Sequence, residues 1–368
     1  GLLHPYLAYQ IAGQIFKLAD EEAVQKKILF IPAAVAQQVP LVAAGITVIY
    51  IYFIYYAAAL MTESFFILGV MASLLLTMVL ASRITESEYR NLAIVLGLTL
   101  SITVLLRQLF LLFVPFLFLW LIIFVYKQRL WSRLVSSVSI VVGILILTIL
   151  PFTIYNYARF DRFVLLNTNA GYVLFWANHP IYGTQFKSAS EMGDTYQKLV
   201  PPELRHLDEA ALDQALLKEG IGFIVDDPKR FIYLSFSRIP EYFKFWLDPT
   251  SGGLSNIARV GSFGLFLPFI IYGLLRPLIK VSRLPKFALS LQSPSPYLLL
   301  LYLFIIIYSA IHLLTWSQIR YRMPVDAVSV VFAALALAEL GNFAIGFIRP
   351  RGQGDNNSLS YPLVVDKS

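Results

Sequence analysis

Residues 151–180 read PFTIYNYARFDRFVLLNTNAGYVLFWANHP, and this stretch follows directly on a long apolar run. Within it, asparagine and arginine residues are interleaved with tyrosine, phenylalanine and tryptophan. Aromatic rings with polar tips are typical of a membrane–water interface. Clustered amides and guanidinium groups are also the donors and acceptors that bind a sugar or a phosphate. The alternative is an interfacial loop whose aromatic residues anchor it and whose amides cap turns.

The composition sets the class of protein. The chain has 368 residues, of which 58% are hydrophobic, and its mean hydropathy is +0.70. A soluble domain of this size needs a more polar surface, so we expect an integral membrane protein. The net charge of +7 lies largely in short loops, which indicates membrane orientation and not nucleic-acid binding. Because cysteine is absent, disulfides, thiolate metal sites and cysteine nucleophiles are excluded.

Long apolar segments lie before and after this stretch. They predict an all-α, polytopic transmembrane helix bundle with a large external loop region. The run 91–126 is too long for one span, so a helical hairpin that turns near Arg107 is expected. The other expected spans are 28–60 (broken by Pro32, Pro40 and Gly45), 61–82, 134–154, 260–275, 297–315 and 323–346, after a short apolar segment at 5–19.

The chain is therefore expected to have four parts. Residues 1–154 and 260–348 form the N-terminal and C-terminal transmembrane helices. Residues 155–259 form the external region, with helical periodicity at 202–225 and an interfacial helix at 231–247. The polar tail, 349–368, is expected to be disordered and cytoplasmic.

Positive charge predicts the orientation. The loops 127–133 and 276–286 carry three and four Lys/Arg residues and are expected in the cytoplasm. Alternation from these loops places Glu63, Arg107, the external region and residues 320–322 on the opposite side. We thus expect a multi-pass protein of the cell membrane whose polar site faces the extracytoplasmic side.

Three groups of polar residues stand where a membrane should exclude them. Glu63 stands at the start of an apolar span. It is either a functional carboxylate or a carboxylate that the dipole of the helix stabilises at its N-terminus. Arg107 either anchors the hairpin tip at the interface or binds an anion. Arg320 and Arg322 flank Tyr321 just before a span, where they suit a phosphate or, alternatively, lipid headgroups.

Familiar catalytic motifs are missing from the sequence. The four histidines, His4, His179, His206 and His312, are far apart and lack the spacing of a metal site. His312 lies within an expected span and is read as a hydrogen-bonded helix residue. The sequence has neither a phosphate-binding P-loop nor a Gly-x-Ser-x-Gly nucleophile motif.

Four segments carry a resemblance to one family. They are HPYLAYQIAGQIFKLA (4–19), IYIYFIYYAAALMTESFF (49–66), LPFTIYNYARFDRFVLLNTNAGYVLFWANHP (150–180) and RYRMPVD (320–326). Together they resemble the GT-C membrane glycosyltransferases of the protein-mannosyltransferase-like type (family 39) in the expected order. The family pattern has Trp and Arg where this chain has Phe152 and Tyr155, so roles at those two positions are left open.

The resemblance implies a bundle with its active site at the outer face. It implies inverting transfer of a sugar from a polyprenyl-phosphate donor to an acceptor, which can be a glycan, a lipid or a protein. A divalent metal is possible in this superfamily, although nothing in the sequence demands one. The first span and the external loop that carries the family's catalytic base are expected before Gly1.

The same resemblance assigns roles to residues of this chain. Glu63 matches a second acidic residue of the active site. The arginines of the Arg-Tyr-Arg motif, together with Arg107, are expected to bind the donor phosphate. The expected sugar or acceptor contacts are Asn167, Asn169, Asn178, His179 and Tyr321.

Two other functions remain open on sequence grounds. A lipid or sugar transporter would have paired broken helices in repeated halves, whereas only 28–60 is broken here. A non-catalytic membrane scaffold would bind a partner through its outer loop and would tolerate loss of the Glu63 charge. Beyond the donor, the partners expected are membrane lipids, and no nucleic acid.

Overall fold

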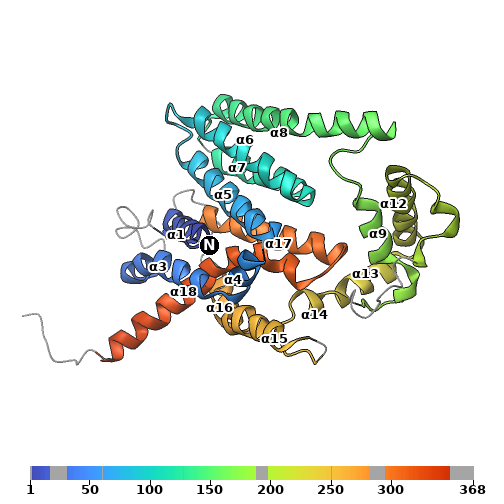
Figure 1. Cartoon of the computed structure of the whole chain (residues 1–368). Coiled ribbons are helices and arrows are strands. Elements are labelled where there is room, and N and C mark those ends of the chain that lie inside the picture. The colour runs from blue at the N-terminus through green and yellow to red at the C-terminus, as the bar shows by residue number, and fades with distance from the viewer. Residues whose placement is uncertain are drawn as a thin grey trace, which may run out of the picture.

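The computed structural model describes residues 2–16, 31–59, 61–126, 128–187, 198–249, 251–281 and 295–348. Over these residues the fold is all-α, and they contain no strand (Figure 1). The predicted tail at 349–368 lies outside the described residues, as do Lys127, Arg283 and Lys286 of the basic loops.

Within the described ranges, seven helices are long and apolar enough to cross a membrane. The chain is thus a multi-pass membrane protein, as its composition predicts. The spans are α5 (Thr62–Ser82), α6 (Tyr89–Leu106), η2 (Gln108–Leu112) with α7 (Val114–Tyr126), α8 (Trp131–Phe160), α15 (Gly253–Arg259) continued by η5 (Val260–Gly264) and α16 (Leu265–Val281), α17 (Ser295–Leu314) and α18 (Ile319–Ile348).

The broken segment predicted at 28–60 is present as a bent pair of helices. Helices α3 (Ala33–Ile49) and α4 (Ile51–Ala58) meet at Tyr50 with a bend of 52°. The extended backbone of Tyr50 makes the break, although Pro40, inside α3, was one of the expected breakers. Helix α1 (Leu3–Phe16) packs beside α3.

Helix α18 lies at the centre of the bundle and packs against α3, α16, α17 and α5 (Figure 1). Its residues from Met323 to Ala336 are almost all buried, and many are alanine, valine or serine. Small side chains let membrane helices approach closely. At Gly273 of α16 a Cβ atom would stand 2.0 Å from the carbonyl oxygen of Phe332, so only glycine fits this contact.

Two helical segments differ in extent from the predicted ones. Helix α8 continues past the predicted span 134–154 to Phe160, and Thr153 and Asn156 bind carbonyl groups of the following loop. The single interfacial helix expected at 231–247 is instead α13 (Pro228–Ser237) and α14 (Ile239–Tyr242), followed by non-helical chain. The break falls at Arg238, whose side chain is fully buried against other helices.

The external region contains a small helical unit beside the bundle (Figure 1). Helix α9 (Ala170–Asn178) packs on α12 (Glu209–Asp226) around Phe175 and Leu216. Asp208 caps α12, which begins at Glu209, later than the periodicity predicted from 202, and ends at Asp226, one residue after its predicted end. Arg238 joins this unit to the bundle, since it donates to the carbonyl oxygens of Ala177 and, at 2.9 Å, of Leu313.

Candidate functional site

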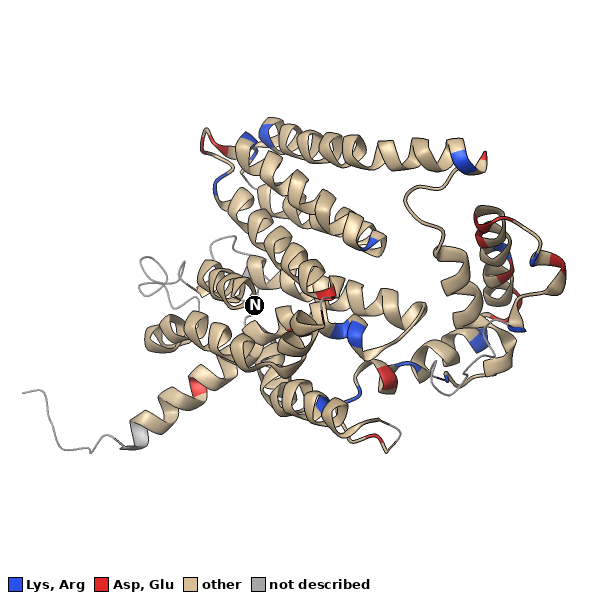
Figure 2. Ribbon diagram, viewed as in Figure 1, with Lys and Arg blue, Asp and Glu red and all other residues tan. Residues whose placement is uncertain are grey.

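Polar residues from distant parts of the chain meet at one end of the bundle. Here α5 and α18 begin and α6 and α17 end, as the predicted alternation of the spans requires. Charged residues lie mostly at helix ends and in the external unit, while the spans between are largely uncharged (Figure 2). The groups that the sequence singled out at Glu63, Arg107 and Arg320 all belong to this end of the bundle.

An ion pair connects two of the predicted residues. Nη2 of Arg107 lies 2.6 Å from Oε1 of Glu63, and both side chains are largely enclosed. Glu63 stands in the first turn of α5, where the helix dipole favours a carboxylate. Arg107 has extended backbone angles that end α6 and open η2, so the hairpin turns where the sequence predicted.

The Arg107 guanidinium also contacts two aromatic rings. Its central carbon is 5.4 Å from the ring centroid of Phe66 and 5.4 Å from that of Tyr321. The neighbouring Arg320 donates to the Tyr321 hydroxyl at 3.3 Å, while its buried Nε has no hydrogen-bond partner among the described residues. Tyr56 is close enough to interact with the charges of both Glu63 and Arg320. Two cations and one carboxylate leave this cluster with one net positive charge.

Aromatic side chains support the cluster from inside the bundle. The ring of Tyr321 stacks on His312 with a centroid distance of 4.9 Å and an interplanar angle of 13°. His312 also contacts Tyr308 edge to face at 4.9 Å, and Nδ1 of His312 faces the Trp316 carbonyl oxygen at 3.4 Å. His312 is thus a helix residue with a backbone contact, as predicted, but its buried Nε2 has no hydrogen-bond partner in the part of the chain that the structure describes.

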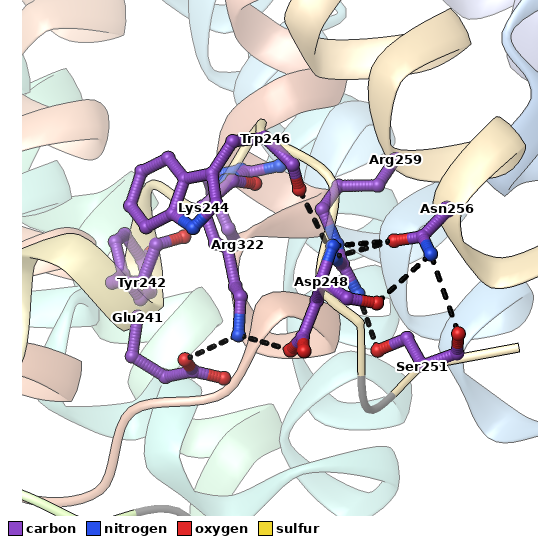
Figure 3. Close-up of polar contacts among 9 residues, drawn as sticks. All are labelled: Glu241, Tyr242, Lys244, Trp246, Asp248, Ser251, Asn256, Arg259 and Arg322. Atoms are coloured by element: carbon purple, nitrogen blue, oxygen red, sulfur yellow. Dashed lines mark hydrogen bonds and ion pairs between the residues drawn. The ribbon is translucent and has the colours of Figure 1, made fainter.

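Arg322 is placed differently from Arg320. Its side chain is fully buried and pairs with Asp326 at 2.9 Å, and Asp326 also accepts from the Tyr50 hydroxyl at 2.8 Å. The guanidinium donates to the carbonyl oxygen of Tyr242 at 2.8 Å and lies 3.5 Å from the Phe263 ring centroid. Figure 3 shows Arg322 together with residues of the 241–259 segment. We therefore revise its expected role from donor contact to holding that segment.

The predicted sugar contacts lie in three different surroundings. The backbone amide of Asn167 donates to Oε1 of Gln108 at 3.1 Å, which brings the loop after α8 against the hairpin next to Arg107. The side chains of Asn167 and Asn169 are exposed, and Asn169 stands at the start of α9 without capping it through its side chain. Tyr321, by contrast, belongs to the charged cluster itself.

Asn178 and His179 take part in the internal contacts of the external unit. Asn178 is buried, and its side-chain oxygen accepts from Arg238 at 3.2 Å. Nδ1 of His179 accepts from the amide of Ile181 at 3.2 Å, and the ring packs against Phe175 and Phe223. Burial, and then the charge of Arg230, lowers the pKa of His179 below its ordinary value.

The described residues do not bring three or more potential metal ligands together. Glu63, the carboxylate of the cluster, is bound to a guanidinium group.

Several residues of this end of the bundle were not predicted. Arg238 and Arg259 are buried and bind backbone carbonyls, and Asp326 forms an intramembrane ion pair. An ionisable residue within an apolar run is a signal that would have marked Asp326. The buried arginines carry no such signal, because they stand among other polar residues of the external region.

Comparison with protein-family models, with curated protein sequences and with solved structures finds no match in any of the three.

Proposed function

We propose that the chain is a membrane-embedded glycosyltransferase that moves a sugar from a polyprenyl-phosphate donor to an acceptor on the extracytoplasmic face. The observation that carries this proposal is the cluster of Glu63, Arg107, Arg320 and Tyr321 at one end of a transmembrane bundle. Guanidinium groups at a helix end, near the level of the headgroups, suit the phosphate of a lipid-linked donor. The resemblance of the four sequence segments adds the reaction class.

The residues would divide the chemistry as follows. The acceptor oxygen bonds to the anomeric carbon as the bond from that carbon to the phosphate oxygen breaks, which inverts the configuration. The acceptor proton passes to a base, which in the family that the chain resembles is an acidic residue of an external loop. Negative charge grows on the departing phosphate, and cations fixed in an enclosed site stabilise such charge strongly.

Arg320 is the proposed phosphate ligand, since its guanidinium lies 5.1 Å from the Tyr321 ring centroid and forms no ion pair within the described part of the chain. Arg107 would share its guanidinium between Glu63 and the donor. Glu63 then acts as a positioning residue, because its carboxylate fixes Arg107 at 2.6 Å. Tyr321 lies between the two arginines, and stacking on His312 holds its ring in place.

The test measures transfer of radiolabelled sugar from polyprenyl-phosphate donors in membranes that contain the full-length protein. We expect Arg320→Ala to lower transfer by about 100-fold, as when one charge-stabilising donor is removed. We expect Glu63→Gln to lower it as well. The matched control is Glu339→Gln, because Glu339 pairs with Arg276 at 3.0 Å on another part of α18, away from the cluster.

Three outcomes separate the alternatives. Loss of transfer in both cluster variants with activity retained in Glu339→Gln supports the proposal. Full activity in Arg320→Ala and Glu63→Gln removes the roles assigned here. Absence of transfer from every donor sugar, with accumulation of labelled sugar or lipid inside sealed vesicles, would indicate a transporter instead.

A further inference from the structure

An irregular segment at the same end of the bundle exposes apolar side chains. After α14 the chain runs through residues 243–249, termed here the 243–249 loop, before α15 begins at Gly253. Its residues Phe245, Trp246 and Leu247 are all exposed. Three adjacent apolar side chains are unfavourable on a surface that faces water, so this group marks a site of contact with another apolar surface.

Side chains from the protein satisfy the backbone of this loop (Figure 3). Arg322 donates to the carbonyl oxygen of Tyr242, which directly precedes the loop, at 2.8 Å and to that of Lys244 at 3.4 Å. Arg259 donates to the carbonyl oxygen of Trp246 at 3.1 Å. Asn256 accepts from the Asp248 amide and donates to the Asp248 carbonyl oxygen, both at 2.9 Å. Irregular backbone in an apolar environment requires such internal partners, because lipid supplies none.

The charges of the loop are also paired with one another. Nζ of Lys244 lies 2.6 Å from Oδ2 of Asp248 and 3.2 Å from Oε2 of Glu241 (Figure 3). Paired and hydrogen-bonded ions can leave bulk water, whereas isolated ions cannot. The charged side chains of the loop are thus largely enclosed, with Lys244 and Asp248 each 15% exposed, whereas its apolar side chains are exposed.

The exposed apolar surface continues into a membrane span. Leu254 and Ile257 of α15 are exposed three residues apart on one helical face, and the exposed Leu265 follows in α16. These helices form the candidate span Gly253–Leu278. The loop therefore extends a lipid-facing surface beyond the end of its helix, at the level where tryptophan is enriched in membrane proteins.

We propose that the 243–249 loop is a membrane anchor that inserts Phe245, Trp246 and Leu247 into the headgroup region of the adjacent lipid leaflet. Its partner is the lipid surface. Arg322 holds the loop from within α18, one residue after Tyr321, so the anchor fixes the depth of the charged cluster relative to the bilayer. This proposal does not depend on the reaction that the protein catalyses.

Because the chain contains no cysteine, a single nitroxide label can be placed at any chosen residue. The variants are Leu247→Cys in the loop and two controls of matched exposure. Leu247 is 68% exposed, Val225 of the external helix α12 is 67% exposed, and Leu147 within the span α8 is 72% exposed. The labelled full chain is reconstituted in phosphatidylcholine vesicles, and collisions with oxygen and with a water-soluble nickel chelate are measured.

The expected result is a ratio of oxygen to nickel collisions for Leu247→Cys that is shifted from the Val225→Cys value towards the Leu147→Cys value. A ratio equal to that of Val225→Cys would place the loop in water and overturn the proposal. Shielding of the label from both reagents would also overturn it, since a protein partner, or a second copy of the chain, would then cover the loop.

Discussion

The Glu63–Arg107 ion pair allows a quantitative prediction about the cluster. Its atoms are 2.6 Å apart, and the side chains of Arg107 and Glu63 are only 19% and 5% exposed. Two unit charges about 4 Å apart at an effective dielectric constant of about 20 attract by about 4 kcal/mol. Loss of hydration offsets part of this attraction, so we expect a net coupling energy of about 2 kcal/mol.

The prediction is tested with Glu63→Gln, Arg107→Gln and the double variant. Each single change leaves one enclosed charge without its partner, and we expect it to lower the free energy of unfolding by about 3 kcal/mol. The double variant should lose less than the sum of the two, because it leaves neither charge uncompensated. Unfolding in mixed micelles with increasing denaturing detergent gives the three free energies.

The same cycle on Arg276 and Glu339 is the internal comparison. Their side chains are 20% and 14% exposed, so water reaches the carboxylate of this pair more readily. We expect a coupling energy of about 1 kcal/mol there, near the upper end for accessible pairs. A coupling energy at Glu63–Arg107 that is near zero, or no larger than at Arg276–Glu339, would refute the reasoning from burial and distance.

Two further predictions concern the external unit. Burial lowers the pKa of His179, so the folded protein binds this proton less tightly than the unfolded chain does. The free energy of unfolding should therefore be constant above pH 6.5 and decrease as the pH falls below it. The protection factor of the Ile181 amide, which removes the pH dependence of intrinsic exchange, should then fall in acid. His179→Asn, which keeps an acceptor but does not titrate, should abolish that dependence; an unchanged dependence would exclude His179. In Gly171→Ala the new Cβ would stand 1.8 Å from the Asp213 carbonyl oxygen, so we expect a loss of about 3 kcal/mol, measured by protease resistance of the α9–α12 unit. Gly222→Ala in α12, where nothing lies within 4 Å, should be neutral or stabilising, and equal effects of the two changes would contradict the steric argument.

The turn of the hairpin was predictable because a polar pair, Arg107 and Gln108, interrupts a run too long for one span. The contact of Arg107 with Glu63 was not, because it joins residues far apart in the chain and depends on how α5 packs beside α6. The sequence marked both residues as out of place for a membrane, but local patterns contain no information about pairing between helices.

The two arginines of the Arg-Tyr-Arg motif show how an error in a predicted helix start changes where side chains are expected to point. Residues two apart on a helix point about 200° away from each other. The sequence placed the start of the last span at 323, which left both arginines in a loop that can direct them to one ligand. The helix begins at Ile319 instead, and this difference sends Arg320 to the charged cluster and Arg322 into the protein.

Arg238 shows why the prediction of one interfacial helix at 231–247 was wrong. This arginine stands near the middle of the predicted helix, yet its side chain is fully buried. Carbonyl oxygens near the C-terminal ends of α9 and α17 accept its hydrogen bonds, and such ends favour a cation. Those partners belong to other helices, so tertiary contacts reverse the environment that the local pattern indicates.

On the proposed function, the presence of Glu63 beside two arginines has a physical explanation. Arg107 and Arg320 both lie within about 5 Å of the Tyr321 ring, and in a partly enclosed site their like charges repel. Glu63 offsets that repulsion while the site is empty and leaves one net positive charge for an anion. Because Arg107 is held at a fixed position before the donor binds, little reorganisation is needed when phosphate charge develops. Removal of the carboxylate would therefore weaken transfer through the loss of this fixed geometry, even though Glu63 touches neither the sugar nor the phosphate.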